Sequence, residues 1–479
     1  MHTTLSHQYN RHRREHWDRV STAKENPLRP GAYYQRLLQR YCRFLVPEGA
    51  RVLELGCGHG DLLAALKPSL GVGVDFSGNM LSVAAGRHPH LHFVQADAQR
   101  IHFKRPFDII ILSDLVNDLW DVQAVLETVR GLTHPGTRIV INFFNNLWRL
   151  PLEGVRRLGK GADFLEQNWL SPDDVRNLLK ITGFEVVKNV AGVLVPVDLG
   201  WIGRVANRFF APVAPFKWFA LANFMAARPV PSEEERKPAG ALTVSVIVPA
   251  RNEAGNIAEI VDRIPEMGAG TEVVFVEGHS QDDTYAAIGS QIDRCPEKHL
   301  SRYRQPGKGK GDAVRLGFEK ASGDILMILD ADMTVPPESL PRFFNVMASG
   351  QGEFINGVRL VYPMAQHAMR FANILGNKFF SILFTWLLGQ PIKDTLCGTK
   401  VLWRADYEKI AANRQYFGDF DPFGDFDLLF GASKQNLKIV EMPIRYQERR
   451  YGETNIRRWY HGWILLKMAT FAAKRIKFI

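Results

Sequence analysis

The sequence predicts two α/β domains in tandem, each built on a parallel sheet, followed by an amphipathic helix. Three observations support this. The chain has 479 residues, which is too long for a single hydrophobic core. Short apolar runs alternate with helix-length segments, as in sheets whose strands are joined by helices. This alternation stops at 229–241, "PVPSEEERKPAGA", where Pro, Gly and charges replace any apolar periodicity, and then starts again.

The apolar runs place the expected strands at 51–56, 71–76, 92–97, 107–114 and 138–144 in the first domain, and at 242–250, 272–278 and 324–332 in the second. We therefore divide the chain into a first domain at 1–228, a linker at 229–241, a second domain at 242–455 and a basic amphipathic helix at 456–479.

Composition is that of a globular protein, with 46% hydrophobic and 23% charged residues. The net charge of +10 allows nucleic acid, a phosphate-bearing substrate or an anionic membrane as partner, or simply a solvated basic surface. Nucleic acid is not expected, because no helix-turn-helix, RNP-type strand or zinc module is found. Four scattered cysteines without a CxxC pair suit a reducing cytoplasm. The polar N-terminal stretch lacks the apolar region of a secretory signal.

Three segments bear on a membrane. The run 371–389, "FANILGNKFFSILFTWLLG", contains two Asn and one Lys, which are costly in lipid, so we expect an interfacial or buried helix rather than a spanning one. The basic, Trp-containing helix at 456–479 is typical of a membrane-surface helix, with packing on the second domain as the alternative. The aromatic and basic segment 193–229 fits an interfacial surface, a lid over an acceptor, or packing between domains.

A glycine-rich turn, "LELGCGHGD" at 53–61, follows the first expected strand. Gly56, Gly58 and Gly60 permit a tight turn and a close backbone approach to a ligand at a helix N-terminus. The next two strands end in Asp75 and Asp97, placed to accept ribose hydroxyls and to read the amino group of adenine. The spacing departs from a dinucleotide fingerprint, which has no acid at the place of Asp61.

Residues 30–190 thereby resemble the class I S-adenosylmethionine-dependent methyltransferases, which have a Rossmann-like sheet. The resemblance implies that Asp75 binds ribose, that Asp97 and Ala98 flank adenine, and that the methionine part is lined by Glu54, Gly56, Gly58 and Gly60. It also places the methyl acceptor near "LSDLVNDLW", where Asp114 is a candidate general base, with a solvated loop acid as the alternative. Methyl transfer from a sulfonium needs in-line positioning and sometimes a base.

Polar motifs also follow the strands of the second domain: Pro249, Arg251 and Glu253, then Glu277, then the Lys308–Lys310 loop, then Asp330, Ala331 and Asp332. The loop is not a Walker A motif, because no hydroxyl follows its lysines to hold magnesium. Two carboxylates one residue apart repel each other, and a divalent cation with a diphosphate relieves that repulsion. The motifs together predict a site for a nucleotide diphosphate.

Their order over 242–455 resembles the family 2 glycosyltransferases, which have a GT-A fold, and in particular the dolichyl- or polyprenyl-phosphate sugar transferases. The resemblance implies that the nucleotide-sugar is bound by Pro249, Arg251, Glu253, Glu277, Lys308 and Lys400, and that Asp330, Ala331 and Asp332 hold its diphosphate through Mg²⁺ or Mn²⁺. The sequence departs from the family at Glu277, where two aspartates are usual, and at Arg251, where Tyr is common.

The acceptor of the sugar is left open between two chemistries. Arg449 in "ERRYGETNIRRW" matches a segment that binds substrate phosphates in that branch, and an ionised phosphate acceptor needs no strong base. A hydroxyl acceptor needs one, and Asp425 or Asp427 in "FDPFGDFDLLF" stands where hydroxyl-acting relatives carry theirs. Capping of a helix N-terminus is the structural alternative for these two acids.

We therefore expect a bifunctional, cytoplasmic enzyme that is peripheral on the inner face of a membrane. Its first half methylates with S-adenosylmethionine, and its second half transfers a sugar with inversion from a nucleotide-sugar to a polyprenyl-phosphate-type acceptor. Two alternatives stay open. The second half can act on a saccharide hydroxyl of a surface polysaccharide, or the first half can be a non-catalytic binding module.

Overall fold

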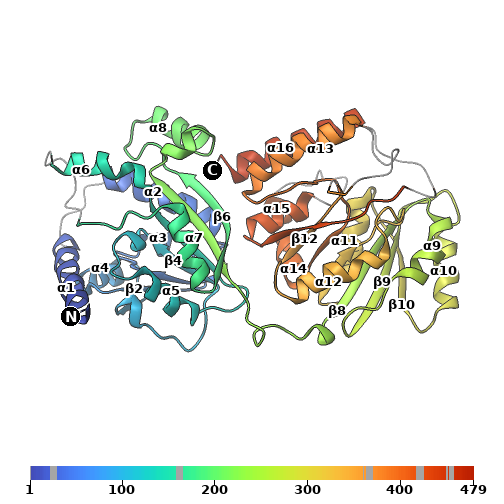
Figure 1. Ribbon diagram of the computed structural model, residues 1–479, viewed down its shortest axis with the longest axis horizontal. Coiled ribbons are helices and arrows are strands. Elements are labelled where there is room, and N and C mark those ends of the chain that lie inside the picture. Colours follow the sequence, from blue (N-terminus) through green and yellow to red (C-terminus); the bar gives the residue numbers. More distant parts are fainter. Residues whose placement is uncertain are drawn as a thin grey trace. The chain divides into compact units, whose positions relative to one another are not determined.

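The computed structural model describes residues 2–21, 30–157, 165–359, 361–362, 371–416, 426–448, 451 and 458–478. They form two compact units, Met1–Pro231 with Lys477–Ile479 (unit 1) and Ser232–Ile476 (unit 2). Figure 1 colours the main part of unit 1 from blue to green and unit 2 from yellow-green to red. Within the described residues each unit has one sheet of seven strands, so the expectation of two α/β sheets is confirmed.

The sheet of unit 1 has the order β3-β2-β1-β4-β5-β7-β6. Neighbours from β3 to β5 pair in parallel, whereas β7 runs antiparallel between β5 and β6. The strands are β1 (Arg51–Leu55), β2 (Leu70–Asp75), β3 (His92–Gln95), β4 (Ile109–Ser113), β5 (Arg138–Phe144), β6 (Phe184–Gly192) and β7 (Ala222–Pro229).

The first five of these strands are the expected ones, whereas β6 and β7 were not predicted. β7 reads "ANFMAARP" and is buried along its whole length, yet it has neither the alternation nor the β-branched residues of a typical strand. Its Arg228 is accommodated because Glu185 on β6 accepts a hydrogen bond from the Arg228 Nε atom at 2.7 Å. Pairing with β5 and β6, rather than the strand propensity of its own residues, makes this segment a strand.

Helices join these strands and extend beyond them. Helix α1 lies beside α4 (Figure 1), so the N-terminal segment covers the β2–β3 side of the sheet. The helices of unit 1 are α1 (His2–Ser21), α2 (Pro30–Leu45), α3 (Asp61–Ala65), α4 (Gly78–Arg87), α5 (Val122–Arg130), α6 (Arg149–Arg157), α7 (Pro172–Ile181) and α8 (Trp201–Val205), with short turns η1 (Ala98–Arg100), η2 (Leu115–Asn117), η3 (Asn146–Trp148), η4 (Ala206–Phe210) and η5 (Phe216–Phe219).

The sheet of unit 2 has the order β10-β9-β8-β11-β13-β12-β14. The first four strands are parallel, β13 is antiparallel to both of its neighbours, and β12 pairs in parallel with β14. The strands are β8 (Thr243–Ala250), β9 (Gly270–Glu277), β10 (His299–Arg304), β11 (Ile325–Ile328), β12 (Phe354–Val358), β13 (Lys400–Trp403) and β14 (Ile439–Pro443). The expected strand at 324–332 ends at Ile328, so both acids of "DAD" lie in the following turn.

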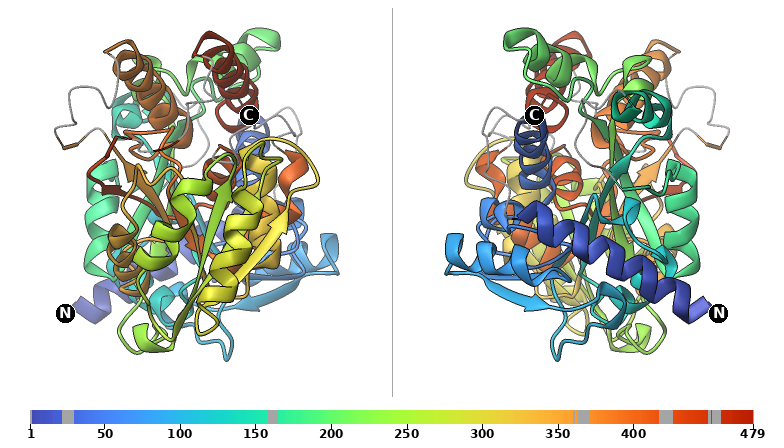
Figure 2. Two further views of the ribbon diagram at one scale, coloured as in Figure 1. Left: turned by 90° about the vertical axis from the view of Figure 1, so that its right-hand side faces the viewer. Right: turned by 90° about the vertical axis from the view of Figure 1, so that its left-hand side faces the viewer.

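Helices α9 and α10 pack together, and Figure 2 shows them side by side on one face of this sheet. Helix α11 contacts β8 and β9, because the connection from β10 to β11 passes back over these two strands. The helices of unit 2 are α9 (Ala254–Arg263), α10 (Thr284–Arg294), α11 (Lys310–Lys320), α12 (Leu340–Ala348), α13 (Phe371–Leu388), α14 (Arg404–Ala412), α15 (Phe426–Lys434) and α16 (Arg458–Ile476), with short turns η6 (Ala239–Ala241), η7 (Pro337–Ser339) and η8 (Arg414–Tyr416).

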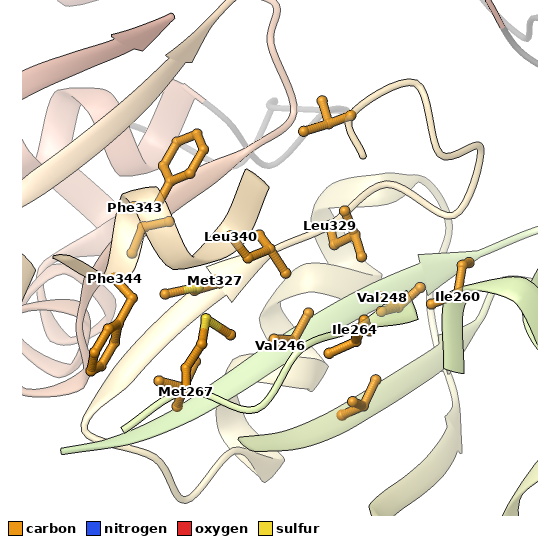
Figure 3. Packing of buried hydrophobic residues seen from close by; sticks show 14 of the residues in the cluster. Val246, Val248, Ile260, Ile264, Met267, Met327, Leu329, Leu340, Phe343 and Phe344 are labelled. Atoms are coloured by element: carbon orange, nitrogen blue, oxygen red, sulfur yellow. The ribbon is translucent and has the colours of Figure 1, made fainter. Parts of the chain in front are cut away.

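The core of unit 2 fixes where its strands end. Figure 3 shows Val246 and Val248 of β8 facing Ile260 of α9 and Ile264 directly after it, with Phe343 of α12 in the same cluster. Each of these side chains is buried, and burying an aliphatic or aromatic side chain of this size contributes about 1.5–3 kcal/mol. The packed face therefore holds the strands in register, and the polar residues that follow them emerge together at one edge.

Helices α13 and α16 contact each other within unit 2. Phe384 and Leu388 of α13 and Met468 and Ala472 of α16 are buried, so one side of each helix belongs to the core of this unit. Across the described part of the chain, the search for a helix long and apolar enough to cross a membrane finds none.

A buried ion pair anchors α13 to the sheet. Asp394 is fully buried, and its Oδ2 and Oδ1 atoms accept from the Nε and a terminal amine of Arg359 at 2.7 and 2.8 Å. Asn377 on α13 donates to Oδ1 at 3.0 Å. Burial opposes ionisation, but the charge and hydrogen bonds of Arg359 outweigh it and lower the pKa of Asp394 to about 2.

We expect Asp394→Asn to destabilise unit 2 by about 3 kcal/mol, because it leaves the Arg359 charge buried without its partner. Since folding lowers the pKa of Asp394, its contribution is complete above the unfolded value of about 3.9 and is lost as the pH falls toward 2. Urea unfolding at pH 7 and near pH 3 measures both effects. Asp262→Asn, in an exposed pair with Arg294, is the matched control and should change stability by less than about 0.5 kcal/mol. Equal effects of the two variants would contradict this assignment.

Candidate active sites

The turn after β1 forms the floor of the first site. Gly56, Gly58 and Gly60 have φ angles of 69°, 50° and 74°, in the left-handed region that only glycine adopts at little cost. A Cβ atom on Gly56 would lie 2.8 Å from a Leu115 methyl carbon, and one on Gly60 equally close to the Phe93 ring, but one on Gly58 would meet open space. The loop thus packs tightly at two glycines and leaves its backbone open at the third.

Asp75, at the end of β2, is held against this turn. The Gly58 N–H donates to its Oδ2 and the Ser77 N–H to its Oδ1, both at 2.9 Å. Burial raises the pKa of Asp75, and these two N–H groups act in the opposite direction. Each oxygen retains a lone pair for a further donor, such as a ribose hydroxyl.

Glu54, one residue before the end of β1, is a buried acid with one oxygen that lacks a hydrogen-bond partner among the described residues. It is 2% exposed, and its Oε2 has no hydrogen-bond partner among the residues that the structure describes. Burial raises its pKa to about 8. A buried, unpaired carboxylate oxygen is costly unless a ligand supplies a donor, so this position fits the ammonium group of an amino-acid-like ligand.

One pocket joins most of the expected cofactor residues. Its lining includes Gly56, Asp75, Asp97 and Ala98. The remaining lining residues come from β2 and β3 or the turns after them, the η2 region and the N-terminal helix: Val74, Phe76, Ala96, Gln99, Leu115, Asp118, Leu119, Trp120, Asn10, Arg13 and Arg14. The structure therefore brings together the glycine turn and both strand-end acids, as the sequence predicts.

Helix α1 contributes a wall of this pocket that the sequence analysis missed. The buried Arg13 forms an ion pair with Asp118, and Trp17 Nε1 donates to Asp118 Oδ2 at 3.0 Å. Asn10 Nδ2 donates to Asp97 Oδ2 at 3.2 Å. The only sequence signal was the high content of Arg and His in this polar helix, and nothing local indicates which acids it meets.

Asp114 lies directly after β4 with a left-handed φ of 52°. Its Oδ1 accepts from the Tyr34 hydroxyl at 2.9 Å and from Asn142 Nδ2 at 2.6 Å. Burial raises its pKa to about 7, against the opposite effect of these two donors. A half-buried carboxylate with this pKa is suited to take up a proton near neutral pH.

The second site lies at the carboxyl edge of the parallel strands of unit 2. Glu277 ends β9 and pairs in register with Ala250 of β8, while Glu253 follows β8; both acids are buried. Asn256 Nδ2 donates to Glu253 Oε2 at 2.7 Å, and the Ser280 N–H donates to Glu277. Pro249, at the end of β8, is half-buried, and Arg251 is exposed at the same edge.

The "DAD" turn is held from both sides. Asp330 Oδ1 lies 2.5 Å from Lys310 Nζ, and a Cβ atom on Gly398 would overlap both groups. Asp332 Oδ1 accepts from the Thr334 N–H and hydroxyl at 3.1 and 2.8 Å, while Ala331 is buried. The two carboxylates are thus fixed separately, one by a cation and the other by its own turn.

The two lysines expected to bind the nucleotide-sugar differ in accessibility. Lys308 is exposed in a loop fixed by the Gly307 N–H, which donates to Asp312 Oδ2 at 2.8 Å. Lys400 is fully buried at the start of β13 and donates to the Cys397 carbonyl. The structure therefore does not bring the Lys400 ammonium to the open edge, whereas Lys310, at the start of α11, is there.

Asp330 and Asp332 provide a compatible, though small, set of metal ligands. Among the described residues, no group of three or more His, Cys, Asp or Glu could hold a metal ion. Mg²⁺ commonly binds through one or two protein carboxylates together with substrate phosphates and water. The two acids fit an ion that arrives with a diphosphate rather than a resident protein-only centre.

Two of the expected acceptor residues, Asp425 and Arg449, lie outside the described residues. On either side of Arg449, the Gln447 N–H donates to the Thr334 carbonyl at 2.9 Å, and the Tyr451 ring lies where a Cβ atom on Gly255 would contact it at 2.9 Å. Gln447 thus lies beside Thr334, just after the "DAD" turn, and Tyr451 lies beside the start of α9.

Asp427, at the start of α15, is buried. Its Oδ2 lies 3.4 Å from Arg414 Nε and 4.0 Å from an Arg315 amine. Both arginines thus oppose the charge of Asp427.

Two family models match separate parts of this chain, one in each unit. A family model described as "Methyltransferase domain" matches residues 28–189, and the "Glycosyl transferase family 2" model matches residues 245–411. A solved S-adenosylmethionine-dependent methyltransferase from Mesorhizobium loti aligns with a TM-score of 0.32 and 21% identity over 40% of this chain and 96% of its own.

Several curated proteins are similar over nearly half of this chain. A low-salt glycan biosynthesis hexosyltransferase of Haloferax volcanii is 28% identical, covering 46% of this chain and 51% of that protein. A dolichol-phosphate mannosyltransferase of Pyrococcus furiosus is 29% identical, covering 45% and 60%. An undecaprenyl-phosphate 4-deoxy-4-formamido-L-arabinose transferase of Pectobacterium carotovorum is 31% identical, covering 44% and 61%. The chain thus spans between half and two thirds of the length of these relatives.

The contacts of α1 predict a specific effect of Asp118→Asn. The substitution keeps the size of the side chain but removes the charge that meets buried Arg13, so we expect α1 to be held about 2 kcal/mol less tightly. Backbone hydrogen exchange in 2–21 should then be roughly thirtyfold faster, as local opening becomes more frequent. Asp173→Asn, in an exposed pair with Arg176, is the control. Unchanged exchange in α1 would show that this pair does not hold the helix.

Proposed function

From the premise that residues 28–189 are a methyltransferase domain and residues 245–411 a family 2 glycosyltransferase domain, we propose that the chain is a bifunctional transferase. One observation supports the proposal most directly: in each unit, acids that could bind the expected ligand lie at or near the carboxyl edge of the parallel strands. In unit 1 these are Glu54, Asp75 and Asp114, and in unit 2 they are Glu253, Glu277 and the "DAD" pair.

In unit 1 we propose that the pocket binds S-adenosylmethionine. The open oxygen of Glu54 would accept from the ammonium group, Asp75 would accept from the ribose hydroxyls, and Asp97 with Ala98 would flank adenine beneath α1. The bound cofactor supplies a methyl group on a sulfonium. Asp114, held by Tyr34 and Asn142, would accept the proton that the methyl acceptor loses.

In unit 2 we propose that the edge binds a nucleotide-sugar. Glu253 and Glu277, with Pro249 and Arg251, would hold the base and ribose, and exposed Lys308 would meet the phosphates. Asp330 and Asp332 would hold Mg²⁺ or Mn²⁺, which when bound neutralises charge on the leaving diphosphate. The acceptor would attack the anomeric carbon from the opposite face, with inversion.

We propose a polyprenyl-phosphate-type acceptor for this second reaction. Two of the similar proteins act, by their names, on dolichol phosphate and undecaprenyl phosphate, and Gln447 donates its N–H to the carbonyl of Thr334, two residues after Asp332. The rival acceptor, a saccharide hydroxyl, needs a base, but Asp427 is buried among Arg414 and Arg315. The other candidate base, Asp425, lies outside the described residues, so the proposal of a phosphate acceptor is supported by the similar proteins.

We propose that unit 2 works as a peripheral protein on the cytoplasmic face of a membrane. Leu375, Phe379 and Ile382 follow helical spacing on α13 and are exposed, as is Trp463 on the adjoining α16. Apolar and Trp side chains on paired surface helices are typical of contact with the lipid interface. Such a position would bring the active edge to a lipid-linked acceptor.

The glycosyltransferase proposal predicts that Asp330→Asn and Asp332→Asn each lower sugar transfer by about 10²–10³-fold, because the charge of the leaving diphosphate is no longer compensated. The assay follows transfer from radiolabelled nucleotide-sugars to polyprenyl phosphate or to glycan hydroxyls, with and without added Mn²⁺ or Mg²⁺. Asp293→Asn, on the exposed side of α10, is the control. Normal turnover and metal dependence in both "DAD" variants would refute the assignment, and transfer only to glycans would favour the hydroxyl acceptor.

The methyltransferase proposal predicts a pH profile. Since Asp114 acts as a base and its pKa is raised to about 7, methyl transfer from labelled S-adenosylmethionine to extracted lipid-linked glycans should fall below pH 7. Tyr34→Phe removes a donor that stabilises the carboxylate, so it should move the midpoint to higher pH without weakening cofactor binding measured by calorimetry. Asp75→Ala should abolish that binding.

Two outcomes would count against the proposed methyltransferase activity. A midpoint unchanged by Tyr34→Phe would remove Asp114 from the role of base. Cofactor binding without any methylated product would favour the non-catalytic binding module instead.

A further inference from the structure

The connection between β6 and β7 exposes an unusual number of large apolar side chains. Trp201 is 69% exposed and Trp218 is 59% exposed. We call the connection, residues 193–221, the β6–β7 surface; its further exposed aromatic and aliphatic members include Ile202, Phe209, Phe210 and Phe219. Single exposed apolar residues are common on proteins, but a cluster of this kind marks a surface that binds something.

The cluster is continuous with the segment after β5. Trp148 Nε1 donates to the Phe219 carbonyl at 2.9 Å, which joins η3 to η5. On either side of Trp148, Leu147 and Leu150 are 60% and 76% exposed. Figure 1 shows α6 and α8 at the same end of unit 1. Two segments that are distant in sequence thus present apolar side chains on one end of the unit.

The backbone under these side chains is fixed. Asn207 is buried, and its side chain accepts from the Val195 N–H at 2.7 Å and donates to the Val195 carbonyl at 2.8 Å. Asn145 Nδ2 donates to the carbonyls of Trp218 and Ala220 at 2.9 and 3.0 Å. Because the polar groups bind inward, the exposure of the aromatic rings is a built feature and not the fraying of a loop.

Charge identifies the kind of partner. The surface carries three exposed cations, Arg204, Arg208 and Lys217, and a single acid, Asp198. That acid faces Arg36 of α2 at 3.5 Å. Trp and Phe together with unbalanced basic residues are the composition that favours the headgroup region of an anionic bilayer. A protein partner of ordinary composition would not require that excess of positive charge.

The position of the surface connects it to the reaction. Gly192 at the end of β6 and Phe144 at the end of β5 both pair with Ala222 at the start of β7. The connection therefore leaves and rejoins the sheet at the carboxyl edge. Asp114 lies at that edge, where its N–H donates to the Asn142 carbonyl of β5 at 3.2 Å.

We propose that unit 1 docks on an anionic lipid bilayer through the β6–β7 surface. Docking there turns the carboxyl edge of the first sheet toward the lipid. It follows that the methyl acceptor is anchored in the bilayer, a consequence that rests on the proposed methyltransferase function.

The test places a reporter in the full-length chain. Trp201→Cys, in a Cys295→Ser background because the other three cysteines are buried, is labelled with an environment-sensitive fluorophore. Ile181→Cys is the matched control, since Ile181 is 56% exposed and ends α7, next to the start of β6 at the opposite edge of the sheet. Vesicles of phosphatidylglycerol with phosphatidylcholine, or of phosphatidylcholine alone, are then added.

We expect a blue shift of the label at 201 with anionic vesicles only, none at 181, and a smaller response at about 0.5 M salt. Unlabelled Trp201→Ser/Trp218→Ser/Phe219→Ser should bind anionic vesicles at least about tenfold more weakly in flotation. The proposal is overturned if the chain floats with vesicles while the label at 201 does not respond. It is also overturned if that label is already shifted without lipid, because a second copy or the other unit then covers the surface; dilution separates these two.

Calorimetry with S-adenosylmethionine separates this proposal from the proposed function. The triple variant should bind the cofactor as the unaltered chain does, which also shows that unit 1 is folded. If the triple variant no longer binds vesicles but still binds the cofactor, the substitutions have affected the β6–β7 surface alone. If the unaltered chain floats with anionic vesicles but binds no S-adenosylmethionine, the docking proposal is supported and the proposed methyltransferase function is wrong.

Discussion

The common direction of neighbouring strands is the constraint on which both sites depend. Because β1, β2, β3 and β4 run in parallel, everything that follows them emerges at one edge, and the same holds for β8, β9, β10 and β11. The strand interiors are mostly apolar, and most acids of the two sites lie at or near the strand ends. Each sheet thereby produces a polar edge that its own backbone N–H groups and helix N-termini only partly neutralise.

The two edges deal with this concentration of charge in different ways. In unit 1 it is met by backbone N–H groups at Asp75 and by Arg13 at Asp118, and burial raises the pKa of Glu54 to about 8 and of Asp114 to about 7. In unit 2 it is met by a fixed cation, because Lys310 lies against Asp330. A carboxyl group that titrates near neutral pH suits a reaction that needs a proton acceptor. A lysine beside a carboxylate suits a ligand that carries several negative charges.

Segments outside the parallel strands complete both units. Helix α1 closes the first pocket with one buried ion pair, and Arg359 with Asp394 ties α13 to the second sheet. Each pair has one buried and one partly buried partner, so each pair fixes one arrangement of its segments as well as contributing to stability. The exposed aromatic residues of the β6–β7 surface have the opposite character, because their rings stay largely open to solvent while Asn207 and Asn145 bind the backbone beneath them.

The amino-acid sequence by itself determined the two sheets, their first strands, the need for glycine at 56, 58 and 60, and the acids at the strand ends. These are local properties, namely apolar runs, turn chemistry and the residue that follows a strand. Only the tertiary structure decided that α1 covers the first pocket, that β7 is a buried strand despite its composition, and that Lys400 is enclosed while Lys310 meets Asp330. Contacts of this kind join residues that are far apart in sequence, such as Arg13 with Asp118, and the energy that selects them comes from packing and charge in three dimensions rather than from local propensity.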